Sequence, residues 1–213
     1  MPGGVMEEEA LIETWILYTI VGFVVGSIPF SLVLGRLFLR TDIRTVGDQN
    51  PGAANVVRAG SKSLGVAAVL LDGFKGCIPV ALAVYASGVS GWAVLPVTMA
   101  PLLGHAFSPF LGGQAGKAIS TTFGLWTALT LWEVPTVLGL ASGVFAYLLG
   151  FKGWAVALAG ATTLVYLLLR QADIVLVTTF AANLLLLLWK YRTDLQHPPQ
   201  LRPAVAQRLG RHQ

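Results

Sequence analysis

The stretch LIETWILYTIVGFVVGSIPFSLVLGRLFL, residues 11–39, is mostly apolar and longer than one membrane crossing requires. A helix rises about 1.5 Å per residue, so about 20 apolar residues span the hydrocarbon core of a bilayer. The stretch is too long for the core of a signal peptide and follows no basic leader, so we expect a retained transmembrane helix. Pro29 lies inside it and removes a backbone donor, which predicts a local disruption of that helix.

Six further apolar runs follow along the chain. They cover Leu64–Ser87, Trp92–Phe110, Ala118–Leu131, Val134–Phe151, Trp154–Leu169 and Ile174–Trp189. Of the 213 residues, 55% are hydrophobic and 11% charged, whereas a soluble domain carries about 25% charged residues. These proportions predict an all-α polytopic membrane protein with about seven transmembrane helices, in one integral-membrane domain over residues 1–196. The pentapeptide DGFKG at residues 72–76 is expected to split the second run into two half-helices.

The positions of the basic residues predict how this domain is oriented. Cytoplasmic loops of membrane proteins carry an excess of Lys and Arg. With seven crossings and the N-terminus outside, every one of the 14 Lys and Arg residues lies on the cytoplasmic side except Lys75, within a span, and Arg170. The C-terminus and the loops at residues 42–58, 112–117 and 190–194 then face the cytoplasm. We therefore expect a multi-pass protein of the plasma (inner) membrane whose polar groups act on the cytoplasmic side.

Several other classes of site are not expected. Cys77 is the single cysteine, which excludes an internal disulfide and a Cys-based metal cluster, and no metal or cofactor is expected. The net charge of +4 is spread along membrane-flanking loops, so topology explains it and no nucleic-acid partner is expected. Residues 197–213 contain Pro and Arg without apolar periodicity, which predicts a disordered cytoplasmic tail.

A polar loop, DIRTVGDQNPGAANVVR at residues 42–58, separates the first two apolar runs. Polar groups at the edge of a membrane are costly and are usually retained for function. Asn50 and Asn55 offer amide donors, and the guanidinium groups of Arg44 and Arg58 pair well with phosphate oxygens. The loop is therefore a candidate phosphate site, with a turn-rich membrane anchor as the alternative.

Two candidates lie within the apolar runs themselves. The hydroxyl of Ser27 can either bond carbonyl groups freed by Pro29 or be presented to a ligand. Asp72 and Lys75 are three residues apart, so they share a helix face. They could form an internal ion pair that makes burial tolerable, or place an ammonium beside a phosphate, and their position in a span favours function.

A fourth candidate is the stretch GHAFSPFLGGQAGKAIST at residues 104–121. Its Gly-rich sequence leads through Gly116 to Lys117 and to hydroxyl side chains at a predicted helix start. Backbone N–H groups beside an ammonium suit a phosphate, although the spacing is not that of a Walker A loop. His105 is either part of this site or a structural histidine at a helix end.

Together these motifs resemble the acyl-phosphate:glycerol-3-phosphate acyltransferase family of bacterial membranes. The matching stretches are GSIPF at 26–30, DIR at 42–44, GxxNxGAxN at 47–55, DxxKGxxPV at 72–80, GHxF at 104–107 and GK at 116–117. The resemblance implies a seven-helix enzyme that transfers an acyl chain from acyl phosphate to the 1-hydroxyl of glycerol 3-phosphate, giving lysophosphatidate in phospholipid synthesis. Acyl phosphate is already activated, so such an enzyme needs no covalent intermediate and works by aligning two anions and stabilising the oxyanion.

The resemblance also implies roles for individual residues and partners. The residues with implied catalytic roles are Ser27, Asn50, Asn55 and His105, and those with implied roles in binding substrate phosphate are Arg44, Arg58, Lys75, Gly116 and Lys117. The implied partners are acyl phosphate, a polyol phosphate such as glycerol 3-phosphate, and the lipid bilayer.

The chain departs from the family pattern at several positions. Asp48 and Gln49 stand where the family has Ser-Gly, Ala54 where it has Thr, and Tyr191 and Asp194 where it has His and Asn. We expect Asp48 to repel an anion unless Arg44 or Arg58 neutralises it. Two alternatives therefore stay open: a non-catalytic or altered-substrate family member that binds a lipid or polyol phosphate, and a small-anion or lipid transporter.

Overall fold

A computed structural model describes residues 3–113 and 115–210, with side chains described for residues 12–113 and 115–208. Regular structure in these ranges is helical, apart from an isolated antiparallel bridge between Leu149 and Leu201. The chain forms two compact units, Met1–Leu131 and Trp132–Gln213, which are described separately below. The single domain over residues 1–196 stays a prediction.

All seven apolar runs form helices, and in the described residues four helical segments are long and apolar enough to cross a membrane. These segments are Ile12–Phe38, Lys62–Ala86, Gly91–Leu111 and Lys152–Leu169. Three helices are shorter: α6 (Ile119–Thr130), α7 (Glu133–Leu148) and α9 (Ile174–Lys190). The all-helical membrane fold is thus confirmed, whereas seven crossings and the positions of the termini stay predictions.

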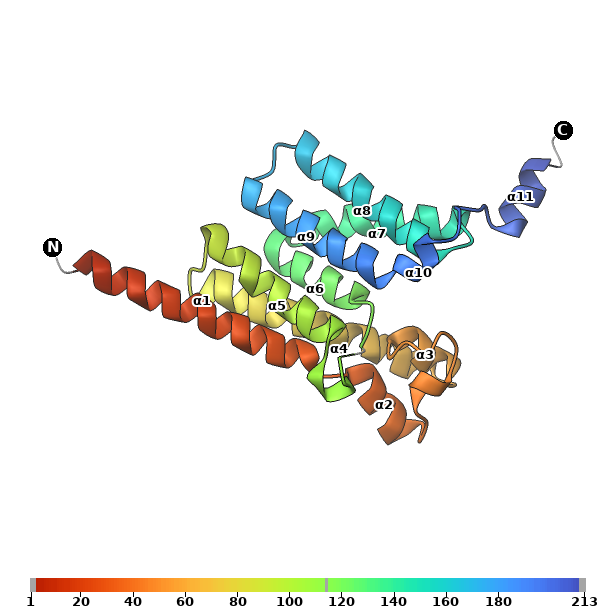
Figure 1. Cartoon of the computed structure of the whole chain (residues 1–213), viewed down its shortest axis with the longest axis horizontal. Helices are drawn as coiled ribbons and strands as arrows, with labels where there is room; N and C mark the ends of the chain where they lie inside the picture. Colours follow the sequence, from red (N-terminus) through yellow and green to blue (C-terminus); the bar gives the residue numbers. More distant parts are fainter. Residues whose placement is uncertain (1–2, 114, 211–213) are drawn as a thin grey trace. The chain divides into compact units, whose positions relative to one another are not determined.

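The first segment is broken where the sequence predicts it. Helix α1 (Gly3–Ser27) ends just before Pro29, and α2 (Phe30–Phe38) begins just after it. Figure 1 shows α1 lying beside α5 (Val94–Ala106), and small residues allow this approach. A side chain on Gly26 would collide with the backbone of Pro101, and one on Gly104 would collide with that of Phe23. Close backbone contact of this kind is typical of helix packing in membranes.

The predicted interruption of the second run at residues 72–76 is wrong. Helix α4 (Lys62–Ala81) runs through these residues without a break and continues into a π-helical turn, Leu82–Ala86, beyond Pro79. Its glycines serve packing instead, because a side chain on Gly76 would collide with the carbonyl of Thr121 in α6, and one on Gly124 with that of Gly73. The charges remain within the helix because they neutralise each other there.

A small apolar core fixes the polar loop to the helices of the first unit. Leu32 from α2, Ile43 from the 3₁₀ turn Ile43–Thr45, Val56 from α3 (Ala53–Arg58) and Ala68 from α4 form one buried cluster. Ile43 and Val56 are fully buried, so the loop has a fixed position beside α2 and α4. Burial of such side chains stabilises their placement by about 1.5–3 kcal/mol each.

The second unit contains α7, α8 (Lys152–Leu169), α9 and the short helices α10 (Arg192–Leu195) and α11 (Pro203–Gly210). The carboxylate of Asp194 accepts a hydrogen bond of 3.1 Å from the amide of Gly153 at the start of α8. Residues 197–202 run along residues 148–151, where Gly150 donates to the carbonyl of Gln200. Backbone bonds thus connect residues 200 and 202 to the α7–α8 turn, while the expected disorder of the C-terminal tail stays a prediction.

Candidate functional site

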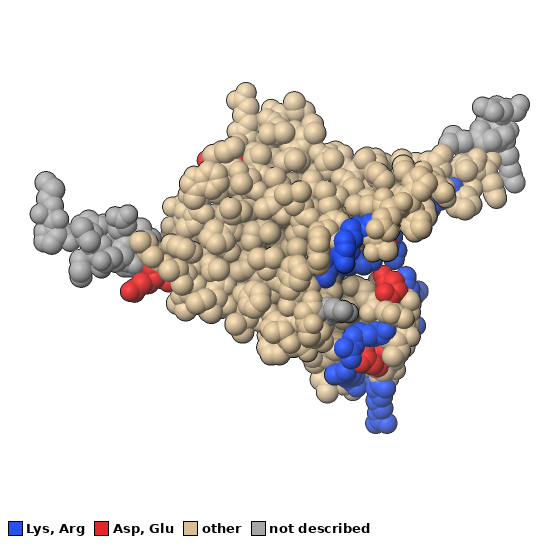
Figure 2. Space-filling view, in the orientation of Figure 1, with Lys and Arg blue, Asp and Glu red and all other residues tan. Residues whose placement is uncertain are grey.

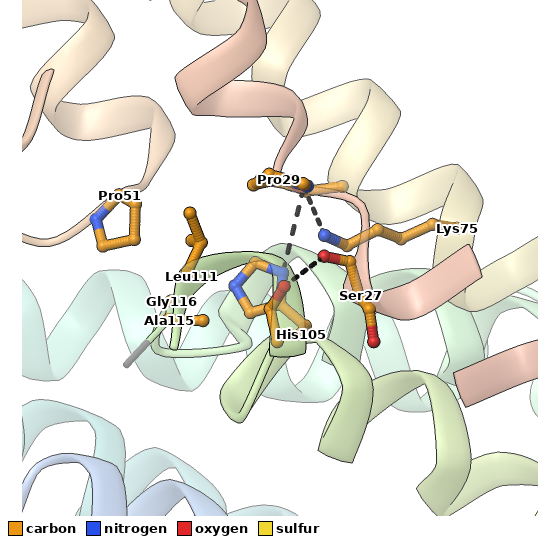
Figure 3. Close-up of a pocket in the computed structure, with 10 residues that line it drawn as sticks. Ser27, Pro29, Pro51, Lys75, His105, Leu111, Ala115 and Gly116 are labelled. Atoms are coloured by element: carbon orange, nitrogen blue, oxygen red, sulfur yellow. Dashed lines mark hydrogen bonds and ion pairs between the residues drawn. The ribbon is translucent and has the colours of Figure 1, made fainter. Parts of the chain in front are cut away.

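The break between α1 and α2 lies against a small pocket in the first unit. The pocket is lined by residues from α1, α4 and α5 and from the loops on either side of them (Figure 3). These residues are Ser27, Pro29, Pro51, Asp72, Lys75, His105, Ser108, Leu111, Ala115 and Gly116. The structure thus brings together five residues singled out by the sequence, namely Ser27, Asp72, Lys75, His105 and Gly116.

Lys75 is a buried cation in this pocket. Its side chain is 2% exposed, and its Nζ atom lies 2.8 Å from Oδ1 of Asp72, one turn earlier in α4. The same ammonium donates to the carbonyl of Ile28 at 2.8 Å and lies over the ring of Phe30. A buried charge is tolerated only when paired and hydrogen-bonded, and both conditions are met here.

Asp72 also connects the two neighbouring helices. Its Oδ2 accepts a hydrogen bond of 3.0 Å from the hydroxyl of Ser31 in α2. Its Oδ1 lies 3.8 Å from Nδ1 of His105 in α5. The other ring nitrogen of His105 faces Gly116 so closely that any side chain at position 116 would overlap the ring. The absence of a side chain at Gly116 therefore allows the imidazole of His105 to pack against the loop that leads to Lys117.

Two serines lie close together where α1 ends. Ser108, which the sequence analysis missed, donates to the carbonyl of Ser27 at 2.6 Å. The hydroxyl of Ser27 itself donates to the carbonyl of Phe23 in the preceding turn at 2.7 Å. The Phe23 carbonyl lies six residues before Pro29 and is not one that the proline frees, so neither function predicted for Ser27 is seen here, and presentation of its hydroxyl to a ligand stays a prediction. The sequence feature that could have identified Ser108 is its position directly after the GHAF motif.

The remaining amides and cations form a second cluster, outside the residues that line the pocket. Asn55 is buried, and its amide donates to Oδ1 of Asp48 at 3.1 Å and to the carbonyl of Asn50 at 2.8 Å. Arg58 lies 3.6 Å from Oδ1 of Asp48, and Lys117 lies 3.4 Å from Oδ2. Arg58 therefore neutralises Asp48, as the sequence analysis allowed, and Lys117 joins it. We call these residues, 48, 50, 55, 58 and 117, the Asp48 cluster.

Arg44 lies apart from the Asp48 cluster and is held by Asp42. Its Nη2 atom is 2.7 Å from Oδ2 of Asp42, and Arg36 reaches the same oxygen at 2.9 Å. Hydrogen bonds from Arg44, and then from Arg36, hold the pKa of Asp42 well below its ordinary value of about 3.9. Side chains of Lys and Arg gather around α2 and α3 in Figure 2, so an anion approaching these elements meets positive charge.

Comparison with known proteins identifies the relatives of this chain. A family model described as "Glycerol-3-phosphate acyltransferase" matches residues 16–198. A curated glycerol-3-phosphate acyltransferase of Anaeromyxobacter dehalogenans is 40% identical over 139 residues, which cover 64% of this chain and 63% of that protein. Glycerol-3-phosphate acyltransferase 1 of Thermotoga maritima is 33% identical over 188 residues, covering 82% of this chain and 92% of that protein. The match spans just under two thirds of the first relative and most of the second.

Two solved structures share the fold. The crystal structure of PlsY (YgiH), an integral membrane glycerol 3-phosphate acyltransferase, in its glycerol 3-phosphate form has a TM-score of 0.77 and 28% identity. The similarity covers 85% of this chain and 90% of that chain. The lysophosphatidic acid form gives a TM-score of 0.76 and 26% identity over the same shares.

Proposed function

Because the chain belongs to the glycerol-3-phosphate acyltransferase family, we propose that it transfers an acyl chain from acyl phosphate to the 1-hydroxyl of glycerol 3-phosphate. The products are lysophosphatidate and inorganic phosphate. The PlsY structures, one in a glycerol 3-phosphate form and one in a lysophosphatidic acid form, support an acceptor and a product of these kinds.

The observation that carries the proposal is the pocket at the α1–α2 break. It has the buried ammonium of Lys75, the imidazole of His105 and two serine hydroxyls among its lining groups. The lining groups include cationic and neutral donors but, in the described residues, no cysteine. Such a set suits a reaction in which the acyl group is already activated and the protein aligns and stabilises charge.

The reaction needs hydrogen-bond donors beside the two groups on which negative charge develops. When the acceptor hydroxyl attacks the acyl carbonyl, negative charge builds on the carbonyl oxygen and then on the departing phosphate. In the proposed mechanism the Ser27 hydroxyl turns from the Phe23 carbonyl to the oxyanion, and Lys75 faces the phosphate. His105 is the group near the pocket that can take up the proton of the attacking hydroxyl. We propose that Gly116, which has no side chain, allows a substrate phosphate to come close to the backbone.

We assign the Asp48 cluster and Arg44 to binding the phosphate group of the second substrate. Asn50 and Asn55 supply amide groups, Arg58 and Lys117 supply positive charge beside them, and Arg44 adds positive charge farther away, where Asp42 holds it. Pro51 and Gly116, which line the pocket, are chain neighbours of Asn50 and Lys117. Binding two phosphates close together costs electrostatic repulsion, and several cations reduce that cost.

We also propose that the protein lies in the plasma (inner) membrane with this site on the cytoplasmic side. The gathering of basic residues around α2 and α3 supports that orientation, because Lys and Arg favour cytoplasmic loops. A lipid-soluble acyl donor and a water-soluble acceptor would meet at that interface. Labelling of a cysteine introduced at Lys62 in intact cells tests the orientation, and modification by an impermeant reagent from outside would contradict it.

The activity is tested with purified full-length protein, acyl phosphate with a labelled acyl chain, and glycerol 3-phosphate. We expect labelled lysophosphatidate that requires both substrates. Ser27→Ala should lower kcat/KM by about a hundredfold if the hydroxyl stabilises the oxyanion. Ser63→Ala, an exposed serine in the first turn of α4, is the matched control and should leave the rate unchanged. Absence of product from intact, folded protein would contradict the proposal.

A second candidate is a family member with an altered substrate or without catalysis. The observation that favours it is Asp48, a carboxylate among the groups assigned to an anion. The same assay separates the two functions when other polyol phosphates replace glycerol 3-phosphate. Product from a different polyol phosphate alone would establish an altered acceptor, and phosphate binding without any product would establish a non-catalytic role.

A further inference from the structure

The carboxylate of Asp48 is held by three different kinds of donor. Its Oδ1 lies 3.1 Å from the amide Nδ2 of Asn55 and 3.6 Å from Nη1 of Arg58. Its Oδ2 lies 3.4 Å from the ammonium of Lys117. Arg58 also donates to Oδ1 of Asn55 at 2.6 Å, which fixes the guanidinium beside the amide. One carboxylate thus engages an amide, a guanidinium and an ammonium.

These three donors are the kinds that recognise a phosphate. Oxygen atoms of a phosphate accept charge-assisted hydrogen bonds from guanidinium and ammonium groups, as a carboxylate does. An individual N–H group that bonds the Asp48 carboxylate is not available to a ligand, although Arg58 and Lys117 carry further N–H groups. The negative charge of Asp48 also offsets the positive charge that would attract a phosphate.

The contacts of Asp48 are exposed enough to exchange with a ligand from solution. The side chains of Asp48, Arg58 and Lys117 are 38%, 41% and 23% exposed. Ion pairs at such exposure are worth about 1 kcal/mol or less, so a ligand of higher charge can replace the carboxylate. Asn55 is buried and stays in place, which leaves a fixed amide for the incoming anion.

The position of the cluster connects it to the pocket. Asp48 lies three residues before Pro51, and Lys117 directly follows Gly116, and both Pro51 and Gly116 line the pocket. The Asp48–Lys117 pair therefore joins the two loops that flank the pocket. An anion that enters there reaches the same donors.

We infer that Asp48 is an internal competitor for the phosphate of a substrate and so sets the affinity of the site. The inference rests on the proposed function, because it concerns the same site. A phosphate dianion carries more charge than the Asp48 carboxylate and displaces it, but the contacts that Asp48 loses are subtracted from the free energy of binding. The site therefore binds phosphate more weakly than the same donors would without the carboxylate.

The test is Asp48→Asn, which keeps the shape of the side chain and removes its charge. Binding of inorganic phosphate to the purified full-length protein is measured by calorimetry, with acetate as the singly charged comparison. We expect Asp48→Asn to tighten phosphate binding about threefold to fivefold and to tighten acetate binding by no more than that. Glu13→Gln makes the same change in net charge in α1 and should leave both affinities unchanged.

A second variant shows whether the effect passes through Lys117. In a Lys117→Met background, Asp48→Asn should tighten phosphate binding less than it does in the wild-type background. Unchanged or weaker phosphate binding by folded Asp48→Asn and Asp48→Ser proteins would overturn the inference. Folding of each variant is checked by its melting temperature.

The outcome is separable from that of the proposed function, since phosphate binding is read without acyl transfer. Tighter phosphate binding by Asp48→Asn supports the inference even if no lysophosphatidate forms. Where acyl transfer occurs, the KM values identify the source of the phosphate. A lower KM for glycerol 3-phosphate assigns Asp48 to the acceptor, and a lower KM for acyl phosphate assigns it to the donor.

Discussion

The Asp72–Lys75 pair within α4 and the Asp48–Lys117 pair between two loops join the same kinds of side chain in opposite surroundings. The first pair is 2.8 Å apart, with side chains 4% and 2% exposed. The second is 3.4 Å apart, with side chains 38% and 23% exposed. Charges without water attract each other strongly and are expensive to separate, whereas charges in water can exchange partners.

The surroundings also differ in the hydrogen bonds that hold each pair. Ser31 bonds Asp72, and the carbonyl of Ile28 bonds Lys75, so each member of the buried pair has a further fixed partner. The exposed pair shares its carboxylate with Arg58 and Asn55, both from α3. The buried pair therefore sets the structure of the pocket, and the exposed pair suits exchange with a ligand.

The largest expected effect comes from breaking the buried pair. Asp72→Asn leaves the ammonium of Lys75 buried without its counter-charge, which should cost about 3–5 kcal/mol of unfolding free energy. Equilibrium unfolding in mixed micelles measures this cost. The double variant Asp72→Asn/Lys75→Met removes both charges and should recover much of the loss. A loss below about 1 kcal/mol in the single variant would show that the charges are not buried.

The next effect concerns the helix contact that encloses the buried pair. Gly124→Ala puts a methyl group where the carbonyl of Gly73 lies, so α6 must move away from α4. We expect a loss of about 1–3 kcal/mol in unfolding free energy. Gly143→Ala is the matched control, since Gly143 is also helical and has no neighbouring atom within 4 Å of the added group. Equal effects of the two substitutions would argue against the close approach.

A smaller, functional effect is expected from the exposed pair. Lys117→Met should raise the KM for glycerol 3-phosphate by about tenfold, because one charged partner of the phosphate is lost, and should leave the melting temperature unchanged. Lys62→Met, in the first turn of α4, makes the same chemical change at another exposed lysine and should have no effect. A lower melting temperature with an unchanged KM would assign Lys117 to structure alone.

The smallest effect is a dependence on pH from Asp42, whose pairs with Arg44 and Arg36 are also exposed. Because its pKa is lower in the folded protein, the folded state binds fewer protons than the unfolded state, and stability rises with pH. The contribution is present above about pH 4, the unfolded pKa, and is lost as the pH falls further. The difference in melting temperature between the wild type and Asp42→Asn should therefore be constant above about pH 5 and should begin to shrink as the pH falls below about 4. A difference that stays constant below about pH 4 as well would contradict this assignment.

Much of the fold follows from the sequence, because the lengths of the apolar runs and the proline at position 29 determine where helices form and break through neighbouring residues alone. The continuity of α4 does not, since the residues that accommodate its glycines lie about 50 positions later, in α6. The contacts of residues 200 and 202 could not be foreseen for a similar reason: their partners are backbone groups of the α7–α8 turn, which carry no signal in side-chain composition.

The candidate site could be predicted as a set of residues but not as an arrangement. The motifs placed Ser27, Lys75, His105 and Gly116 in one functional group, and the structure brings them to one pocket. The pairing of Lys117 with Asp48 could not be foreseen, because it joins loops 69 residues apart whose orientation depends on the buried core around Ile43 and Val56. The catalytic and binding roles stay predictions until substrates are tested.

The interruption at Pro29 has a consequence for which substitutions this chain can accept during evolution. The turn that links α1 to α2 leaves the carbonyl of Ile28 facing α4, where it accepts a hydrogen bond from Lys75. A residue that restored a continuous helix at position 29 would redirect this carbonyl along the helix axis and remove a partner of the lysine. Positions 29 and 75 should therefore change together or not at all, although 46 residues separate them in the chain.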